Sequence, residues 1–440
     1  MKTKTKVLAS TLSIFSTFTL CAYGAAFQVN ENSPFLQGMA MAGSGASPDD
    51  VTSIFNNPAA LGFIKKSQIY VGSSYAFTHV DINNAKAFHG TLPNPENMDP
   101  VTGSSSQNNI VKNSPIPEIY AAWKLSDLLT SGISVTTPWG MTSEYNSDSV
   151  VRFMAQKTSL QSVNISPMMS LKVTKKVSIA AGVQVQYLSS EFSNYDGSAF
   201  GQGDHPTDLS MDGWGVGYLL GLMYHPFSNT YVGLSYRSKI KTHLSGNGAM
   251  YVEPGPIAPP INPSLPYNSY TSASTDFNTP AVLNFSITQS LTGKWSVSST
   301  VQYTFWNTFK DIVISTPEGY AKKTTINYDW HNSWFIALGT SYQLFPSLSV
   351  RSGISFDQTP TPSSSRDARI PDASRLTLAF GASYKLLENL RLDASYEHMF
   401  MMNTSINTTQ YIGGNKEKNT VSANYSGSAD IISLGISYKF

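Results

Sequence analysis

Apolar and polar residues alternate with a period of two along much of the chain. The pattern is clearest at the end, where residues 432, 434, 436, 438 and 440 are Ile, Leu, Ile, Tyr and Phe, separated by Ser, Gly, Ser and Lys. Similar alternation occurs over residues 177–187, 295–305 and 376–385. Successive side chains of a strand point to opposite faces, so the pattern predicts strands with one apolar and one polar face. Such strands are typical of a transmembrane β-barrel.

Connections of two lengths separate these strands. Short ones occur near residues 126–129, 173–176, 226–229, 292–294, 345–347 and 387–389. Long polar or proline-rich ones occur at residues 81–115, 145–150, 193–212, 244–276, 310–329, 358–373 and 403–426. This rhythm predicts an all-β, antiparallel barrel of about fourteen strands, with short turns on the periplasmic side and long loops outside. A soluble β-sandwich is the alternative, but strands of about ten residues or more favour the barrel.

Residues 25–66 lack strand alternation and are predicted to form a separate domain. Small residues are frequent between positions 38 and 46, and large apolar residues such as Phe35, Ile54 and Phe63 accompany them. A disordered periplasmic tail would contain fewer apolar residues. We therefore expect residues 25–66 to fold inside the lumen as an N-terminal hatch, or plug, and residues 67–440 to form the barrel.

The first 24 residues are typical of a cleaved secretory signal. Three lysines among the first six residues precede a moderately apolar stretch, and residues 22–24 (Ala-Tyr-Gly) are suited to cleavage. The mature chain is expected to begin at Ala25. The single cysteine, Cys21, lies within the signal. A lipoprotein signal is the alternative, but residues 18–20 (Phe-Thr-Leu) differ from the small residues expected before a lipidated cysteine.

Composition is consistent with a membrane-embedded barrel. Charged residues make up 13% of the chain, which is about half the usual share in a soluble domain, and aromatic residues make up 12%. No run of 18 or more apolar residues lies beyond the N-terminal signal, which argues against a transmembrane helix. The net charge of +1 gives no reason to expect a nucleic-acid partner. We expect a monomer in the lipid of a bacterial outer membrane.

An ordered series of motifs resembles the FadL/TodX (OMPP1) family of outer-membrane transporters for hydrophobic compounds. AAFQVNE at residues 25–31 is similar to the mature N-terminus of the family, and Asn57-Pro58-Ala59 is similar to its hatch motif. Further similar segments are PWGMTSEY at 138–145, GL at 221–222, GLSYRS at 233–238, FDQTP at 356–360, RIPD at 369–372 and Arg375. Single motifs are weak evidence, but the ordered set covers nearly the whole mature chain.

The resemblance implies an uptake channel for long-chain fatty acids or similar small hydrophobic molecules. Substrate would bind in a pocket beside the hatch, to which Phe27 is expected to contribute, and would leave sideways through a gap at a kinked strand. The resemblance implies no catalytic residue, no metal and no cofactor.

Pro138 and Gly140 are the residues at which we expect the strand to kink. Proline cannot donate to the strand ladder, and glycine tolerates the backbone of a bulge. Lipid cannot satisfy free backbone groups, so protein must cover such a gap, and we expect the Asn57-Pro58-Ala59 loop to do so. The alternative is that Pro138 only marks the end of a strand, where a loop begins.

The sequence leaves the substrate open. Members of the family that carry fatty acids have a basic residue near the end of the fifth strand, whereas residues 186–191 here are QYLSSE. A buried carboxylate needs a paired charge or hydrogen bonds. Arg152, Lys157 and Arg375 are the candidates for this role. If none of them serves, the ligand is uncharged, and an aromatic hydrocarbon is the alternative substrate.

Other functions have weaker support. The chain lacks metalloprotease, α/β-hydrolase, CxxC and Walker motifs, and its seven histidines lack metal-ligand spacing. An outer-membrane lipid hydrolase would need a Ser–His pair, for which His331 or His398 could serve. A general diffusion porin would need an open, charged lumen, which an apolar plug argues against.

Overall fold

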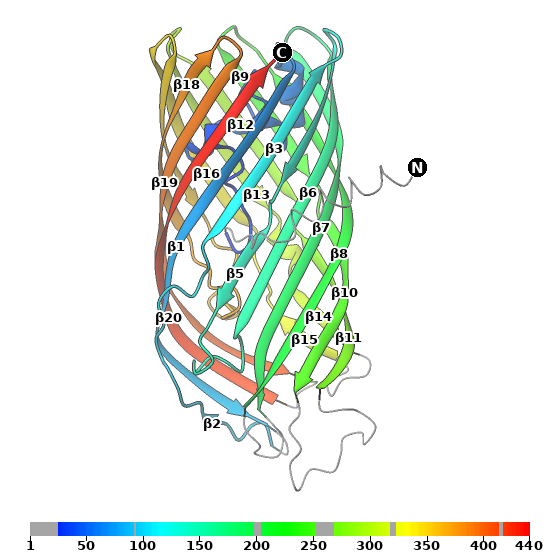
Figure 1. Ribbon diagram of the computed structural model, residues 1–440, viewed down its shortest axis with the longest axis vertical. Helices are drawn as coiled ribbons and strands as arrows, with labels where there is room; N and C mark the ends of the chain where they lie inside the picture. The colour runs from blue at the N-terminus through cyan, green and yellow to red at the C-terminus, as the bar shows by residue number, and fades with distance from the viewer. Residues whose placement is uncertain (1–24, 92–93, 198–203, 252–267, 317–322, 413–416) are drawn as a thin grey trace.

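The strands of the computed structural model form one closed barrel (Figure 1). The structure describes residues 25–91, 94–197, 204–251, 268–316, 323–412 and 417–440, so the expected signal with Cys21 lies outside the described residues. Closure follows from the pairing of β1 (Gln68–Gly90) with β3 (Ser114–Lys124) on one side and with β20 (Glu417–Lys439) on the other. The remaining strands are β2 (Asp99–Pro100), β4 (Leu129–Thr136), β5 (Gly140–Glu144), β6 (Lys157–Lys172), β7 (Val177–Gly197), β8 (Asp204–Tyr224), β9 (Thr230–Arg237), β10 (Ile240–Tyr251), β11 (Asn268–Thr279), β12 (Val282–Ser290), β13 (Trp295–Thr304), β14 (Asp311–Ser315), β15 (Lys323–Asn327), β16 (Ser333–Phe345), β17 (Leu348–Asp357), β18 (Arg375–Leu387) and β19 (Leu390–Ile412).

The wall has fourteen strands in the part of the chain that the structure describes. Five of them are each made of two successive segments: β4 with β5, β9 with β10, β11 with β12, β13 with β14, and β15 with β16. The short β2 only extends the outer end of β1. The predicted number of strands is therefore confirmed.

All six short turns lie at the end of the barrel that carries the C-terminus (Figure 1). At the other end the strands are longer than predicted. β1 continues to Gly90, and the pairing of β10 with β11 extends as far as Tyr251 and Asn268, inside the stretch expected to be a 244–276 loop. The centre of that stretch, residues 252–267, lies outside the described residues. The prediction was wrong here because strands that project beyond lipid are wet on both faces and lose their apolar alternation.

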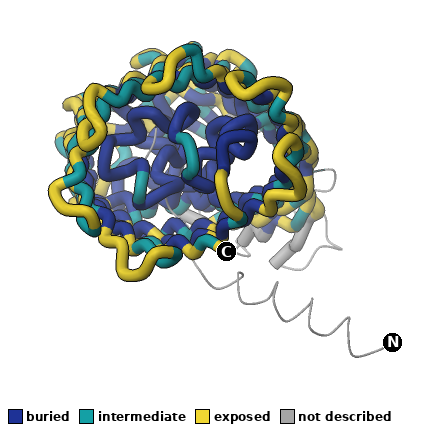
Figure 2. Tube along the Cα trace, turned by 90° about the horizontal axis from the view of Figure 1, so that it is seen from above, coloured by how far each residue is buried: buried dark blue, intermediate teal, exposed yellow. Residues whose placement is uncertain are grey.

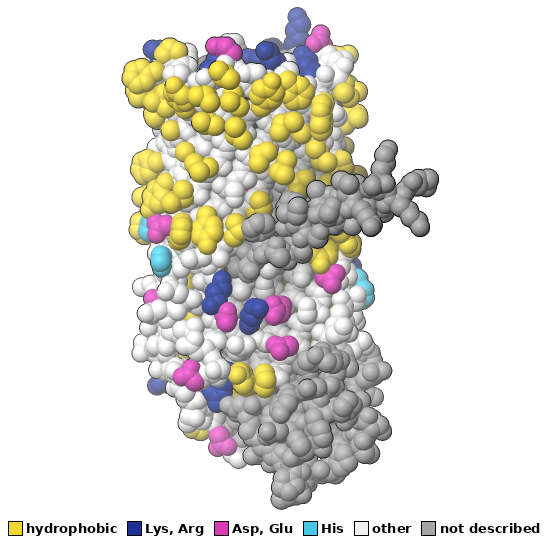
Figure 3. Space-filling model, viewed as in Figure 1, with side chains coloured by type: hydrophobic (Ala, Val, Ile, Leu, Met, Phe, Trp, Pro, Cys, Tyr) yellow, Lys and Arg dark blue, Asp and Glu magenta, His cyan; other side chains and the backbone are white. Residues whose placement is uncertain are grey.

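On the face shown in Figure 3, exposed apolar side chains form a belt over the half of the barrel nearer the short turns. On β1 it includes Val71, Tyr75 and Phe77, which alternate with inward-facing residues such as Ser74 and Ala76. Charged side chains lie beyond the belt on the face shown. The outward alternation thus marks the depth at which the wall meets lipid.

The N-terminal segment, residues 25–66, lies inside the barrel (Figure 2). Nearly all of it is buried. It contains α2 (Pro34–Gln37) and the 3-10 helices η2 (Val51–Phe55) and η3 (Pro58–Phe63), and a further 3-10 helix, η4 (Trp306–Thr308), follows β13. Ser33, Asp50 and Asn57 cap the three N-terminal helices through their side chains. None of the described helices is long and apolar enough to cross a membrane.

Small residues let the N-terminal segment lie directly against the wall. A Cβ atom at Gly233 would lie 1.9 Å from the carbonyl oxygen of Gly45, and one at Gly381 would lie 2.6 Å from the Cα of Gly38. Gly43 has a positive φ of 77°, and its N–H donates to Thr300 Oγ1 at 2.9 Å. The cluster of small residues between positions 38 and 46 therefore reflects backbone-to-backbone packing inside the lumen.

Candidate functional site: a break in the wall and the segment that fills it

The barrel wall is broken where β3 faces β4 and β5. β3 pairs with β4 only from Ile119 toward the short turn, although its pairing with β1 continues as far as Ser114. β4 ends at Thr136, and the strand resumes as β5. Residues 113–118 and 137–139 are therefore two facing edges that do not pair with each other.

The strand does not end at Pro138. Beyond it, β5 pairs with β6, and the backbone N–H of Lys112 donates to the carbonyl of Thr142 at 3.0 Å. The N–H of Glu144 likewise donates to the carbonyl of Ile110 at 2.8 Å. The wall is thus complete on both sides of a short interruption.

Two prolines stand on the opposite edge of the break. Pro115 and Pro117 lie in β3, and the register of β3 with β1 runs past both without a shift. Residues two apart in a strand direct their backbone groups to the same neighbour, and proline has no N–H to donate. The uninterrupted pairing with β1 therefore indicates that the missing donors face the break. This signal, two prolines at strand spacing, was present in the sequence and was missed.

The N-terminal segment fills the break from inside. Gln28 forms an antiparallel bridge with Trp139. The N–H of Val29 donates to the carbonyl of Pro138, and the N–H of Gly140 donates to the carbonyl of Phe27, both at 2.9 Å. The segment thus acts as a short replacement strand for β5's missing neighbour.

The Asn57-Pro58-Ala59 loop does not cover the break, so that expectation was wrong. Asn57 Nδ2 donates to the carbonyls of Gly45 at 2.9 Å and Leu222 at 3.0 Å. Ser178 Oγ donates to the carbonyl of Ala59 at 2.6 Å. These contacts hold η3 against β7 and β8. The part of the N-terminal segment that reaches Pro138 is residues 27–29, about thirty residues earlier in the chain.

Phe27 sits in a cage of aromatic rings. We define the aromatic cage by the rings around it: Trp139, Phe277, Trp306, Phe309 and Trp330. Their centroids lie 4.9–6.0 Å from that of Phe27. The Phe27 side chain is 1% exposed. Edge-to-face and tilted pairs at these separations are favourable. The cage is built from β11, η4 with its C-cap Phe309, and the connections between β4 and β5 and between β15 and β16. Sequence patterns alone did not bring these residues together.

Arg375 lies close to the start of the N-terminal segment. The N–H of Ala25 donates to Asp357 Oδ2 at 2.8 Å, and Asp357 is the register partner of Arg375 across β17 and β18. Arg375 also forms a buried ion pair with Asp372. Of the predicted pocket residues, Phe27 and Arg375 are therefore brought to the same region.

Arg152 and Lys157 have other surroundings. Arg152 Nη1 donates to the carbonyls of Thr102 at 2.8 Å and Ser149 at 3.1 Å, in the connection between β5 and β6. Lys157 Nζ lies 2.8 Å from Glu191 Oε2, and both side chains are partly exposed. These partners, in the described part of the chain, belong neither to the aromatic cage nor to the Asp357–Arg375 pair.

The connection between β17 and β18 also folds into the lumen. Residues 366–373 are buried. Tyr145 Oη donates to the carbonyl of Ala368 at 2.7 Å, and Ser143 Oγ donates to the carbonyl of Arg369 at 2.8 Å. Ser143 and Tyr145 follow the break along the chain, so this inward connection braces the strand just beyond it.

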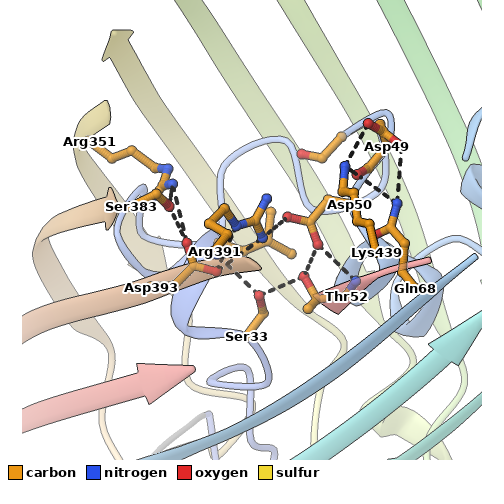
Figure 4. Close-up of polar contacts among 12 residues, drawn as sticks. Ser33, Asp49, Asp50, Thr52, Gln68, Arg351, Ser383, Arg391, Asp393 and Lys439 are labelled. Atoms are coloured by element: carbon orange, nitrogen blue, oxygen red, sulfur yellow. Dashed lines mark hydrogen bonds and ion pairs between the residues drawn. The ribbon is translucent and has the colours of Figure 1, made fainter. Parts of the chain in front are cut away.

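A polar network anchors the N-terminal segment to β19 (Figure 4). Arg391 Nη2 lies 3.0 Å from Asp50 Oδ2, and Arg391 Nε donates to Asp393 at 3.0 Å. The ring of Phe35 lies 4.0 Å from the guanidinium of Arg351 and 4.4 Å from that of Arg391. Such cation–π contacts add to the ion pair.

The charge of Asp50 fits this anchor. Burial opposes ionisation, but the Arg391 cation and hydrogen bonds from Thr52 outweigh it and lower the pKa of Asp50. The second anchor lies beside it, where Lys439 Nζ contacts Asp49 Oδ2 at 2.7 Å and Gln68 Nε2 donates to Asp49 Oδ1 at 3.0 Å (Figure 4). The segment is thus held by ionic contacts far along the chain from the two hydrogen bonds at the break.

Comparison with known proteins identifies the family. The model of the outer membrane protein transport protein family (OMPP1/FadL/TodX) matches residues 15–440. The chain belongs to this family. It is a bacterial outer-membrane protein, and named members of its family are transporters of fatty acids and hydrocarbons.

Relatives and solved structures agree with this assignment. The chain is 29% identical to a putative outer membrane protein of Neisseria meningitidis serogroup B, covering 90% of each protein. It is 26% identical to the long-chain fatty acid transport protein of Escherichia coli O6:H1, covering 90% of this chain and 92% of the relative. The fold matches a Pseudomonas aeruginosa FadL homologue with a TM-score of 0.83 at 24% identity, over 94% of this chain and 100% of the other. It also matches the Ralstonia pickettii toluene transporter TbuX with a TM-score of 0.65 at 17% identity, over 96% and 99%.

Proposed function

We propose that this chain takes up long-chain fatty acids or similar small hydrophobic molecules across the outer membrane. Ligand binds beside the N-terminal segment and leaves sideways through the break between β3 and β5. The observation that carries the proposal is the filling of the break. A wall strand would be held by a continuous ladder, whereas Phe27 and Val29 hold this position with two backbone hydrogen bonds.

Lateral release suits an apolar cargo. Transfer of a hydrophobic chain from protein to water costs about 0.8 kcal/mol for each CH₂ group. An opening at the depth of the apolar belt delivers the chain to lipid and avoids that cost. The route past the N-terminal segment into the periplasm would instead require the anchors at Asp50 and Asp49 to separate from β19 and β20.

The expected maturation of the chain strengthens the arrangement. Cleavage of a signal at residues 1–24 would turn the Ala25 amide, now 2.8 Å from Asp357, into an ammonium group. An ion pair there would hold the start of the segment close to Arg375 while leaving residues 27–29 free to exchange with ligand. In this proposal, residues 25–66 are the hatch and residues 67–440 are the channel.

A second ligand class has support of its own. The five rings of the aromatic cage pack around the ring of Phe27. An uncharged aromatic hydrocarbon could take the place of that ring when the segment moves. Both classes would use the same route, neither requires catalysis or a cofactor, and a monomer suffices for either.

A disulfide across the break tests the route directly. Gln28 and Trp139 are bridge partners, and partners of this antiparallel type lie about 4.5 Å apart at Cα, within the range of a disulfide. The variant Gln28→Cys with Trp139→Cys, in a chain whose natural cysteine is Cys21, can be closed by oxidation. We expect uptake of a labelled long-chain fatty acid to fall to background in the oxidised form and to return on reduction.

The matched control ties the segment down elsewhere. Ser44 Oγ and Thr300 Oγ1 lie 3.3 Å apart on the far side of the segment, so Ser44→Cys with Thr300→Cys adds a disulfide away from the break. Its oxidised form should transport normally. Equal transport by the oxidised and reduced Gln28–Trp139 variant would exclude the lateral route.

A further inference from the structure

Polar atoms without partners line both edges of the break. On β3, Glu118 is 1% exposed, and neither of its carboxyl oxygens has a hydrogen-bond partner among the described residues. On the other edge, the hydroxyls of Ser134, Thr136 and Thr137 are buried and also lack partners there. We call these four residues the polar rim.

The register places the polar rim around the end of the β3–β4 pairing, with Ser134 still paired with Tyr120. Ile119 and Val135 are the last paired residues of β3 and β4 on this side, so Glu118 and Thr136 are the next residues on the two facing edges. Ile116, two positions from Glu118 on the same face, packs against Val29 of the filling segment. The rim therefore adjoins the part of the wall that the segment fills.

A passage for purely apolar molecules does not need such a rim. A buried polar group without a hydrogen bond is destabilising, and an unpaired buried carboxylate is more so. The four groups lie on the two facing edges, and both hydrogen-bond donors and acceptors are present. A group with its own donor and acceptor would satisfy several of them at once.

We propose that the polar rim binds the neutral head group of an amphiphilic ligand, a protonated carboxylic acid or an alcohol, as its chain passes through the break. Glu118 and the head group exchange hydrogen bonds as two carboxylic acids do, and the hydroxyls of Thr136 and Thr137 complete the shell. An ionised head would face the Glu118 carboxyl with no cation supplied by the rim. This inference rests on the proposed lateral route and selects fatty acids and alcohols over hydrocarbons.

Three ligands of equal chain length test the proposal: dodecanoic acid, dodecanol and dodecane. Uptake of each is measured in cells that depend on this protein for transport. Glu118→Leu, which keeps the size and removes the polar atoms, should slow the acid and the alcohol about tenfold and leave dodecane unchanged. Glu118→Gln keeps a donor and an acceptor, so both polar ligands should stay within about twofold of the parent.

A second pair of variants guards against a general defect. Thr136→Val should slow the acid and the alcohol about threefold, as expected for one lost hydrogen bond. Thr275→Val removes another buried hydroxyl without a described partner, on β11, and should change nothing. Heat-modifiable migration on a gel confirms that each barrel has folded.

The outcomes separate the two proposals. Equal slowing of all three ligands by Glu118→Leu, or no slowing of any, would show that the rim does not recognise head groups. If the parent carries dodecane alone, the lateral channel stands and the head-group subsite is refuted. A parent that carries none of the three refutes the proposed function and the rim with it.

Discussion

Two regions of the same wall differ in how their backbones are satisfied. β20 pairs with β1 along nearly its whole length, from Lys439 to Lys418, with one irregularity between Asn83 and Lys86. β3 pairs with β4 only over residues 119–124, and its outer part faces a gap. The first region is continuous wall. The second is wall plus a piece of the N-terminal segment.

The difference shows how a barrel wall can contain an interruption at membrane depth. Lipid offers no hydrogen bonds, so an unpaired edge there is costly. The break reduces that cost on one edge through Pro115 and Pro117, which have no N–H to leave free. On the other edge, Val29 donates to the carbonyl of Pro138, and the carbonyl of Phe27 accepts from the N–H of Gly140. The same barrel therefore contains both a seam closed by a continuous strand ladder and a seam closed by a separate segment of the chain.

The largest expected effect comes from placing a proline in the continuous region. Ser433 lies in β20 between Ser74 of β1 and Ser395 of β19. Ser433→Pro removes a ladder donor from a strand that is paired on both sides, a position where proline is essentially not found. We expect no heat-modifiable barrel to assemble. The reciprocal variant Pro117→Ser, at the break, should assemble normally, and failure of both would remove the contrast between the regions.

Closing the break should be the next largest effect. Pro138→Thr with Gly140→Val supplies the missing donor and a strand-forming side chain, and should favour continuous pairing between β3 and the repaired strand. We expect fatty-acid uptake to fall at least about tenfold while the purified protein still binds ligand. Unchanged uptake would mean that substrate leaves by another path, past the N-terminal segment into the periplasm.

Loosening the filling segment should give a smaller and local effect. Phe27→Ala empties the aromatic cage, and loss of a buried Phe costs about 3–5 kcal/mol where the site cannot collapse. Amide hydrogen exchange should rise at residues 25–31 and stay slow at η2 and η3. The matched variant is Phe35→Ala, beside Arg391. It should raise amide exchange at η2 and η3 and leave exchange slow at residues 25–31. Exchange that rises equally in both places would show that the segment moves as one unit.

Asn57→Ala should have the smallest effect on transport. Asn57 caps η3 and binds the carbonyls of Gly45 and Leu222, so the change should cost about 1–2 kcal/mol in the docking of η3. Because these contacts do not reach the break, we expect uptake to fall less than about threefold. Urea titration of the N-terminal segment measures the loss of docking stability, and an uptake assay measures the effect on transport. A loss of uptake as large as that from closing the break would show that this loop takes part in transport.

The sequence by itself determined the architecture. A polar residue between every two apolar ones, as along residues 432–440, is sufficient to predict a wall with a wet and a lipid face, and the turn lengths predict its number of strands. The apolar and small residues of 25–66 predicted a segment inside the barrel, and Pro138 with Gly140 marked the interruption. These features are local, because strand period, turn chemistry and proline geometry act over a few residues.

Only the tertiary structure decided what meets at the break. Sequence reasoning assigned the cover to Asn57-Pro58-Ala59, whereas Gln28 pairs with Trp139 across 111 positions of chain. The aromatic cage around Phe27 and the polar rim at Glu118 likewise join residues from separate strands and loops. No periodic pattern encodes which inward side chains of a closed barrel face one another, because that depends on the register of every strand between them and on the path of the chain inside.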